Sequence, residues 1–174
     1  MSIHKSYRNI EKMLDRYQLF LDKVDETEFQ VNPEPGVWSY AEVYSHIFSA
    51  NYACLIAIQN CVQGKGIESK EQASLAGRII LFLGVFPPVK IKAPERIAAM
   101  VKKINKAQAK QEMEKFKENL SKLLPEITTA SSSQKAKHPR MGLFNAKQWL
   151  RFIEIHTRHH EKQLYRIEAA LKKP

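Results

Sequence analysis

Two histidines stand four residues apart in the C-terminal segment, at His156 and His160. On a helix turning about 100° per residue they are separated by roughly 40°, so both imidazoles point to the same side. Trp149, Phe152 and Ile153 share that side, which makes it an apolar stripe. Burying two imidazoles is costly unless their nitrogens find partners, and one divalent metal ion bound by both rings would provide them.

A third histidine, His46, falls in a separate helical segment. The residues on its side of that helix are mostly small, and small neighbours leave room for a metal or a substrate. They are Ser39, Val43, Ala50, Ala53, Cys54 and Ala57. Three histidines from two helices would form a ligand set with one or more open positions, as in catalytic metal sites. Spacing leaves two alternatives open, this metal site or separate hydrogen-bonded core histidines, because it does not show that the two helices meet.

Other candidate residues receive structural interpretations. His159 diverges by about 100° from His160, so we expect it at the edge of the stripe and not among the ligands. His138 lies in a predicted loop and is interpreted as orienting that loop, with a position at a pocket mouth as the alternative. Trp38 and Trp149 are interpreted as helix-end anchors, with a pocket wall as the alternative.

Several enzyme classes are excluded by missing motifs. Thr157 follows His156 where a zinc protease would carry its catalytic glutamate. The sequence has no nucleophile elbow, phosphate-binding loop, dinucleotide fingerprint or di-iron Glu-x-x-His pair. Ligation by histidine alone suits zinc, nickel, iron or copper.

The histidines must be positioned by helices, because apolar residues recur every three or four positions through most of the chain. We predict an all-α, antiparallel four-helix bundle in one domain over residues 1–174, with a short helix inserted between helices 2 and 3. A capping box, Ser39 to Glu42, begins the second helix, and a second one, Ser69 to Gln72, is predicted to begin the short helix. The predicted long helices span about 3–24, 39–62, 106–124 and 145–171, with a loop over 128–142 and an ambiguous, largely irregular connection over 87–105.

The 174 residues carry a net charge of +10, but lysines alternate with glutamates in the most basic segment, as on a solvated helix face. We therefore expect no nucleic-acid partner, and nucleic-acid binding is the weakest of three functional hypotheses. The longest apolar stretch is too short to cross a bilayer, so no membrane association is expected. The two cysteines, Cys54 and Cys61, are interpreted as reduced core residues of a cytoplasmic protein.

The string Trp38-Ser39-x-x-Glu42-x-x-x-His46, followed by His156-x-x-x-His160 and Gln163, resembles the DinB-like superfamily. The stretch 138–143 resembles one branch of it. The resemblance implies a four-helix bundle, often dimeric, so a homodimer is expected. It also implies that His46, His156 and His160 are the ligands of a divalent metal.

Relatives implied by this resemblance include S-transferases that use bacillithiol or mycothiol, and thiol-dependent isomerases. We therefore expect a metal-dependent enzyme in which zinc, nickel or iron activates a thiol or water, as in a thiol S-transferase. Its expected partners are a low-molecular-weight thiol and a small electrophile. The alternative is a non-catalytic, metal-containing binding or stress-response module.

Overall fold

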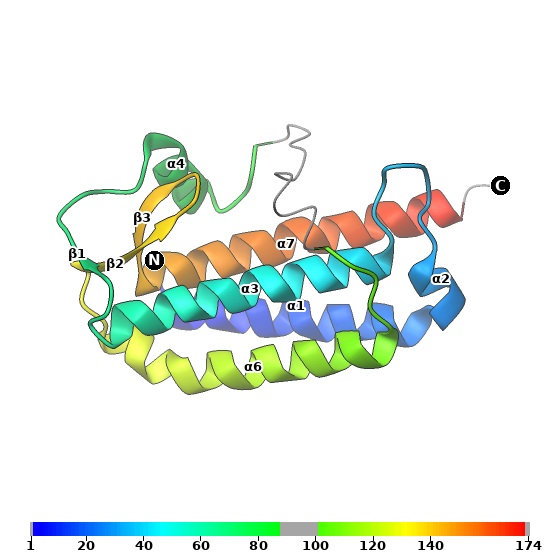
Figure 1. Cartoon of the computed structure of the whole chain (residues 1–174), viewed down its shortest axis with the longest axis horizontal. Helices are drawn as coiled ribbons and strands as arrows, with labels where there is room; N and C mark the ends of the chain where they lie inside the picture. Colours follow the sequence, from blue (N-terminus) through cyan, green and yellow to red (C-terminus); the bar gives the residue numbers. More distant parts are fainter. Residues whose placement is uncertain (1, 88–100, 173–174) are drawn as a thin grey trace.

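The computed structural model describes residues 2–87 and 101–172. Four long helices lie side by side as a bundle, and α1 and α7 run in one direction while α3 and α6 run in the other (Figure 1). The predicted all-α four-helix bundle is confirmed. The helices are α1 (Ile3–Lys23), α3 (Tyr40–Val62), α6 (Lys106–Thr129) and α7 (Ala146–Leu171).

Two buried tyrosines join three of these helices. The Tyr17 hydroxyl on α1 donates to the Thr157 carbonyl oxygen on α7 at 3.0 Å. The Tyr44 hydroxyl on α3 donates to the Tyr17 carbonyl oxygen at 2.6 Å. Both tyrosines are fully buried, so these bonds hold α1, α3 and α7 in place against one another. The acceptor on α7, Thr157, directly follows His156 in the sequence.

The helix starts follow the predicted caps. The Ser39 side chain accepts from the Glu42 amide while Glu42 accepts from the Ser39 amide, so the capping box at the start of α3 is confirmed. Asn145 and Gln148 form the same arrangement at the start of α7. The third long helix is longer than predicted and runs through Pro125 to Thr129, because its last turns still bury Ile127.

The predicted start of the short helix is wrong. Helix α4 (Leu75–Leu83) begins after Ser74, whose side chain accepts from the Gly77 amide, and not after Ser69. Ser69 instead donates its backbone N–H to the Ser133 carbonyl oxygen. Ser69 therefore extends the pairing of β1 and β2 and does not act as a helix cap. The helix ends at Gly84, which adopts a left-handed conformation with φ of 72°.

The predicted loop over 128–142 is also wrong. Strands β2 (Gln134–His138) and β3 (Gly142–Asn145) form an antiparallel hairpin, and β1 (Ile67–Glu68) pairs with the other edge of β2. These strands are short, and β2 is mostly polar, so they lack the alternation that identifies a strand from sequence. The five-residue helix α2 (Glu26–Gln30) was not predicted either, and most of the connection 87–105 lies outside the described residues.

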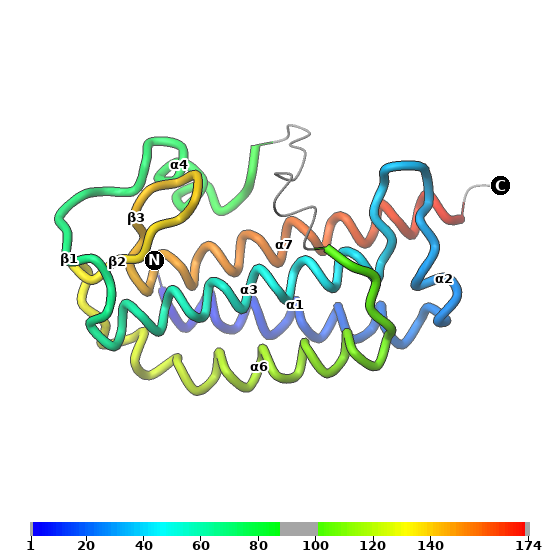
Figure 2. The backbone as a smooth tube through the Cα atoms, in the orientation of Figure 1, coloured from blue at the N-terminus to red at the C-terminus, as the bar shows by residue number. Residues whose placement is uncertain are grey.

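The backbone trace shows how the small elements are distributed. The hairpin and α4 lie at the end of the bundle where α7 begins, and α2 lies at the opposite end (Figure 2).

Cys54 and Cys61 are buried and unpaired with each other, as predicted. Within residues 2–87 and 101–172, no helix is both long and apolar enough to cross a membrane.

Candidate metal centre

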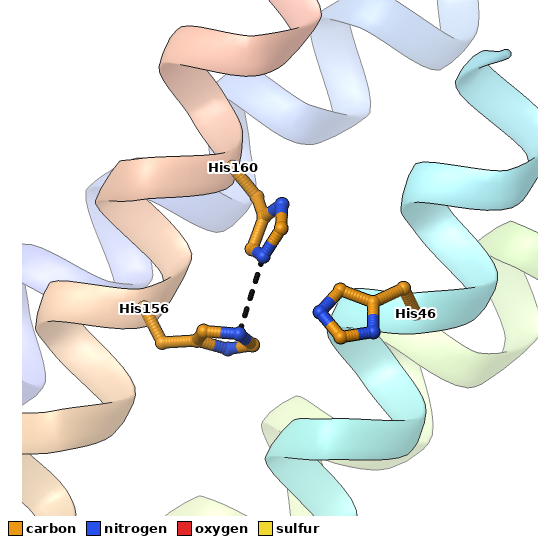
Figure 3. Close-up of side chains that lie close together, drawn as sticks. All are labelled: His46, His156 and His160. Atoms are coloured by element: carbon orange, nitrogen blue, oxygen red, sulfur yellow. Dashed lines mark hydrogen bonds between the residues drawn. The ribbon is translucent and has the colours of Figure 1, made fainter. Parts of the chain in front are cut away.

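His46 from α3 meets His156 and His160 from α7 between the two helices (Figure 3). Each histidine offers one ring nitrogen, and these nitrogens all lie within 4.8 Å of one another. The His46 ring centroid is 5.3 Å from that of His156 and 4.7 Å from that of His160. The structure therefore brings together the three histidines that the sequence pattern singled out, and their role as metal ligands remains a prediction.

Two amide side chains orient the histidines of α7. The Nδ1 atom of His160 lies 2.8 Å from Oε1 of Gln163, and Nδ1 of His156 lies 3.4 Å from Oδ1 of Asn51. Asn51 donates its Nδ2 to the Thr157 hydroxyl at 3.1 Å, which turns its carbonyl oxygen toward His156. A carbonyl oxygen only accepts, so each Nδ1 carries the ring hydrogen.

The remaining ring nitrogens of this pair face each other. Nε2 of His156 and Nε2 of His160 are 3.2 Å apart (Figure 3). With hydrogen on both Nδ1 atoms, both Nε2 atoms present lone pairs, and two lone pairs at this distance repel unless a cation lies near both. Two nitrogens on one tetrahedral zinc are roughly 3.3 Å apart, given Zn–N bonds of about 2.0–2.1 Å. The donor set thus fits a divalent ion.

Burial keeps all three imidazoles neutral and ready to donate lone pairs. Burial, with a smaller effect of the neighbouring His159, lowers the pKa of His46 to about 4. Burial is also the main cause that holds the pKa values of His156 and His160 well below the ordinary range, and the nearby histidines add to it. At neutral pH, protons therefore compete little with a metal for these nitrogens.

Aromatic rings enclose the cluster. Trp38 packs on His46 with ring centroids 5.1 Å apart, so it covers one side of the cluster. Phe152 stacks on His156 at 5.6 Å and an interplanar angle of 14°. His159 is exposed and contacts His160 edge-on at 5.0 Å, in agreement with its predicted place at the edge of the stripe.

His138 does not lie in a loop. It is the last residue of β2, and its ring packs 4.7 Å from Phe152 and 5.4 Å from Trp149. The hairpin thus carries His138 onto the face of α7 that bears the histidine cluster. Burial lowers the pKa of His138 to about 4.

The predicted small-residue face of α3 is only partly in the core, and His46 lies at its border. Large apolar residues such as Tyr44, Ile47 and Phe48 take the buried side because they remove more apolar surface from water. Of the predicted set, Ser39, Val43 and Cys54 are buried, Ala50 and Ala57 are half-buried, and Ala53 is exposed.

Sequence reasoning gave Asn51 and Gln163 no role in the site. Asn51 is fully buried in the middle of α3, five residues after His46. The sequence did carry one signal for Asn51. Asparagine disfavours helix interiors, so its presence in a largely apolar helix indicates a specific role. Gln163 stood in the quoted motif, but its bond to His160 depends on a rotamer that no pattern specifies.

Comparison with known proteins identifies the family. The family model of the DinB superfamily matches residues 9–164. The chain belongs to the DinB superfamily. This confirms the resemblance based on the Trp38–His46 string and the histidines of α7. No curated protein matches the chain.

Two solved structures share the four-helix bundle fold of this DinB superfamily chain. TT2238, described as a four-helix bundle protein, matches with a TM-score of 0.53 and 16% identity, over 95% of this chain and 99% of that one. YfiT from Bacillus subtilis, described as a probable metal-dependent hydrolase with an unusual four-helix bundle topology, matches with a TM-score of 0.65 and 12% identity. That match covers 97% of this chain and 89% of YfiT. At these identities the likeness shows the fold.

Proposed function

We propose that this protein is a metal-dependent enzyme that activates a nucleophile, a thiol or water, for attack on a small electrophilic substrate. The observation that carries the proposal is the 3.2 Å separation of the Nε2 atoms of His156 and His160, with His46 facing them across the site. Such an arrangement is unfavourable without a cation and fits a ligand set that leaves coordination positions open.

A divalent ion held by these three residues acts as a Lewis acid and lowers the pKa of a bound thiol or water. The chain's own residues supply the geometry. Gln163 and Asn51 hold the imidazoles with Nε2 inward, while Trp38 and Phe152 cover the rings.

The charges beside the cluster favour an anionic nucleophile. Burial is the main cause that lowers the pKa of His159 and of His160. The positive charge of Arg166 adds a smaller effect on both imidazoles, and that of Lys162 adds one on His159. Both cations lie on the exposed side of α7. Cations near neutral ligands stabilise a thiolate or hydroxide relative to its protonated form.

The chain's own thiols do not supply the nucleophile. Burial raises the pKa of Cys54 to about 12 and that of Cys61 to about 11, so both are protonated at neutral pH. A thiol reaction therefore needs a small thiol from solution, in line with an S-transferase related to those that use bacillithiol or mycothiol. The description of YfiT as a probable metal-dependent hydrolase favours water as the nucleophile.

A paired assay tests the proposal. Untagged protein, loaded with zinc, nickel or iron, is given an alkylating electrophile with a small thiol in one arm and an activated ester with water in the other. We expect one arm to exceed the spontaneous rate and to lose that excess in His156→Ala. The matched control His4→Ala changes an exposed histidine on α1 and keeps full activity. A rate that is indifferent to metal and to His156 in both arms contradicts the proposal and favours a non-catalytic module.

A further inference from the structure

The face of α7 that bears the cluster continues as an aromatic surface toward the start of the helix. Trp149 lies seven residues before His156, about two turns, and therefore on the same side. Phe152, which stacks on His156, packs edge-on against Trp149 with centroids 5.9 Å apart. Trp149 is thus connected to the histidine cluster by a single aromatic ring.

The hairpin holds His138 against this surface in a fixed orientation. His138 pairs with Gly142 across the hairpin, and Gly142 adopts φ of 80° with its Cα so close to Ser74 that a Cβ there would lie 2.9 Å from the Ser74 nitrogen. The Arg140 backbone N–H donates to Nδ1 of His138 at 3.2 Å. A neutral ring that accepts at Nδ1 carries its hydrogen on Nε2, so Nε2–H is a donor.

Trp149 contributes a second donor without a partner. Its side chain is almost completely buried, and its Nε1–H has no acceptor among the described residues. Buried indole N–H groups ordinarily find an acceptor, because leaving one unsatisfied costs free energy. The rings of Trp149 and His138 have centroids 5.4 Å apart, so the two N–H groups belong to adjacent rings.

We propose that Trp149 Nε1–H and His138 Nε2–H together bind a carbonyl-type oxygen of the substrate, that of an amide, an ester or a carboxylate. His138 and Trp149 both pack on Phe152, which stacks on His156, so a molecule bound at these donors would lie one aromatic ring away from the histidine cluster. The site therefore selects substrates that carry such an oxygen over purely hydrocarbon or halide electrophiles. The identification of this ligand as the substrate rests on the proposed function. The oxygen-binding site itself is inferred from the Trp149 Nε1–H group, which has no partner among the described residues.

Nuclear magnetic resonance tests the site in the metal-free protein. The chain has two tryptophans, so a ¹⁵N-labelled sample gives two indole N–H cross-peaks, and Trp149→Phe identifies the Trp149 peak. Acetamide and acetate are titrated separately. We expect the Trp149 peak to move downfield and saturate with at least one probe, while the Trp38 peak stays in place as the internal control.

Two variants examine the second donor. We expect His138→Phe to weaken probe binding roughly tenfold, as for loss of one hydrogen bond, and His138→Gln, which keeps an N–H donor, to recover part of it. Non-saturating shifts, equal shifts of both indole peaks, or binding indifferent to His138→Phe overturn the proposal. Because the titration uses no metal and no turnover, an inactive enzyme with a saturable Trp149 shift refutes the proposed function alone.

Discussion

Replacing Gln163 by alanine tests whether an amide partner prepares a histidine for metal binding. The bond from His160 Nδ1 to Gln163 Oε1 is 2.8 Å long, and a hydrogen bond of this kind contributes about 0.5–1.5 kcal/mol net. Since about 1.4 kcal/mol corresponds to tenfold in affinity, we expect the zinc Kd to rise about tenfold. This is the lower end of the roughly 10–100-fold range for partners of ligating histidines, because Gln163 is only half-buried and water can replace its oxygen.

Replacing Asn51 should affect mainly the stability of the fold, whereas replacing Gln163 should affect mainly zinc affinity. Its bond to His156 is longer, at 3.4 Å, but it is fully buried and also donates to Thr157. Asn51→Ala therefore leaves buried polar groups without partners, and we expect it to lower the free energy of unfolding by about 1–3 kcal/mol. Gln163→Ala should leave the stability of the metal-free protein nearly unchanged.

The assay is competition for zinc with a fluorescent chelator at pH 7.5, together with denaturant unfolding of the metal-free protein. Gln163→Glu keeps an acceptor and should bind zinc at least as tightly as the wild type. Gln18→Ala, which removes a half-buried glutamine bonded to Asp22 on α1, is the matched control. Zinc affinity equal to wild type in Gln163→Ala would refute the reasoning.

Three further predictions concern stability. The pKa of His46 is about 4 in the folded chain and about 6.5 when unfolded, so the unfolded state takes up the proton first as pH falls. The metal-free protein should thus lose up to about 3 kcal/mol from this residue between pH 6.5 and 4, and urea unfolding of His46→Gln with an unchanged pH slope would contradict this. Tyr17→Phe should cost about 1 kcal/mol in chemical denaturation, because the Thr157 carbonyl loses its donor; no measurable change would be the opposing result. Glu154→Gln should lower Tm clearly, because the buried carboxylate pairs with Arg151 and a second arginine on α7, and an unaltered Tm would argue that these pairs are not stabilising.

The long helices and their caps could be predicted because their signals are local. The capping boxes at Ser39 and Asn145 depend on residues three positions apart, and the apolar stripes repeat every three or four residues. The second predicted box, at Ser69, had the same local pattern, but the Ser69 backbone N–H instead bonds to the carbonyl oxygen of Ser133, which is far away in the sequence. The hairpin strands are too short to carry a periodic signal, so their pairing is visible only in three dimensions.

In the candidate site, too, the local features could be predicted from the sequence, and the contacts between helices could not. The common direction of His156 and His160 follows from the geometry of one helix. The approach of His46 depends on how α3 packs against α7, which spacing left open. The contact between Asn51 and His156 joins residues 105 positions apart, so it could not be predicted from the sequence alone.

The most direct test of the central claim is the metal content of untagged protein after equilibrium dialysis against zinc. We predict about one equivalent per chain for the wild type and less than about 0.2 for His46→Ala, His156→Ala or His160→Ala, since each removes one of three ligands. His4→Ala should match the wild type. A wild type that binds less than about 0.2 equivalents, or ligand variants that retain the full equivalent, would contradict a three-histidine metal centre.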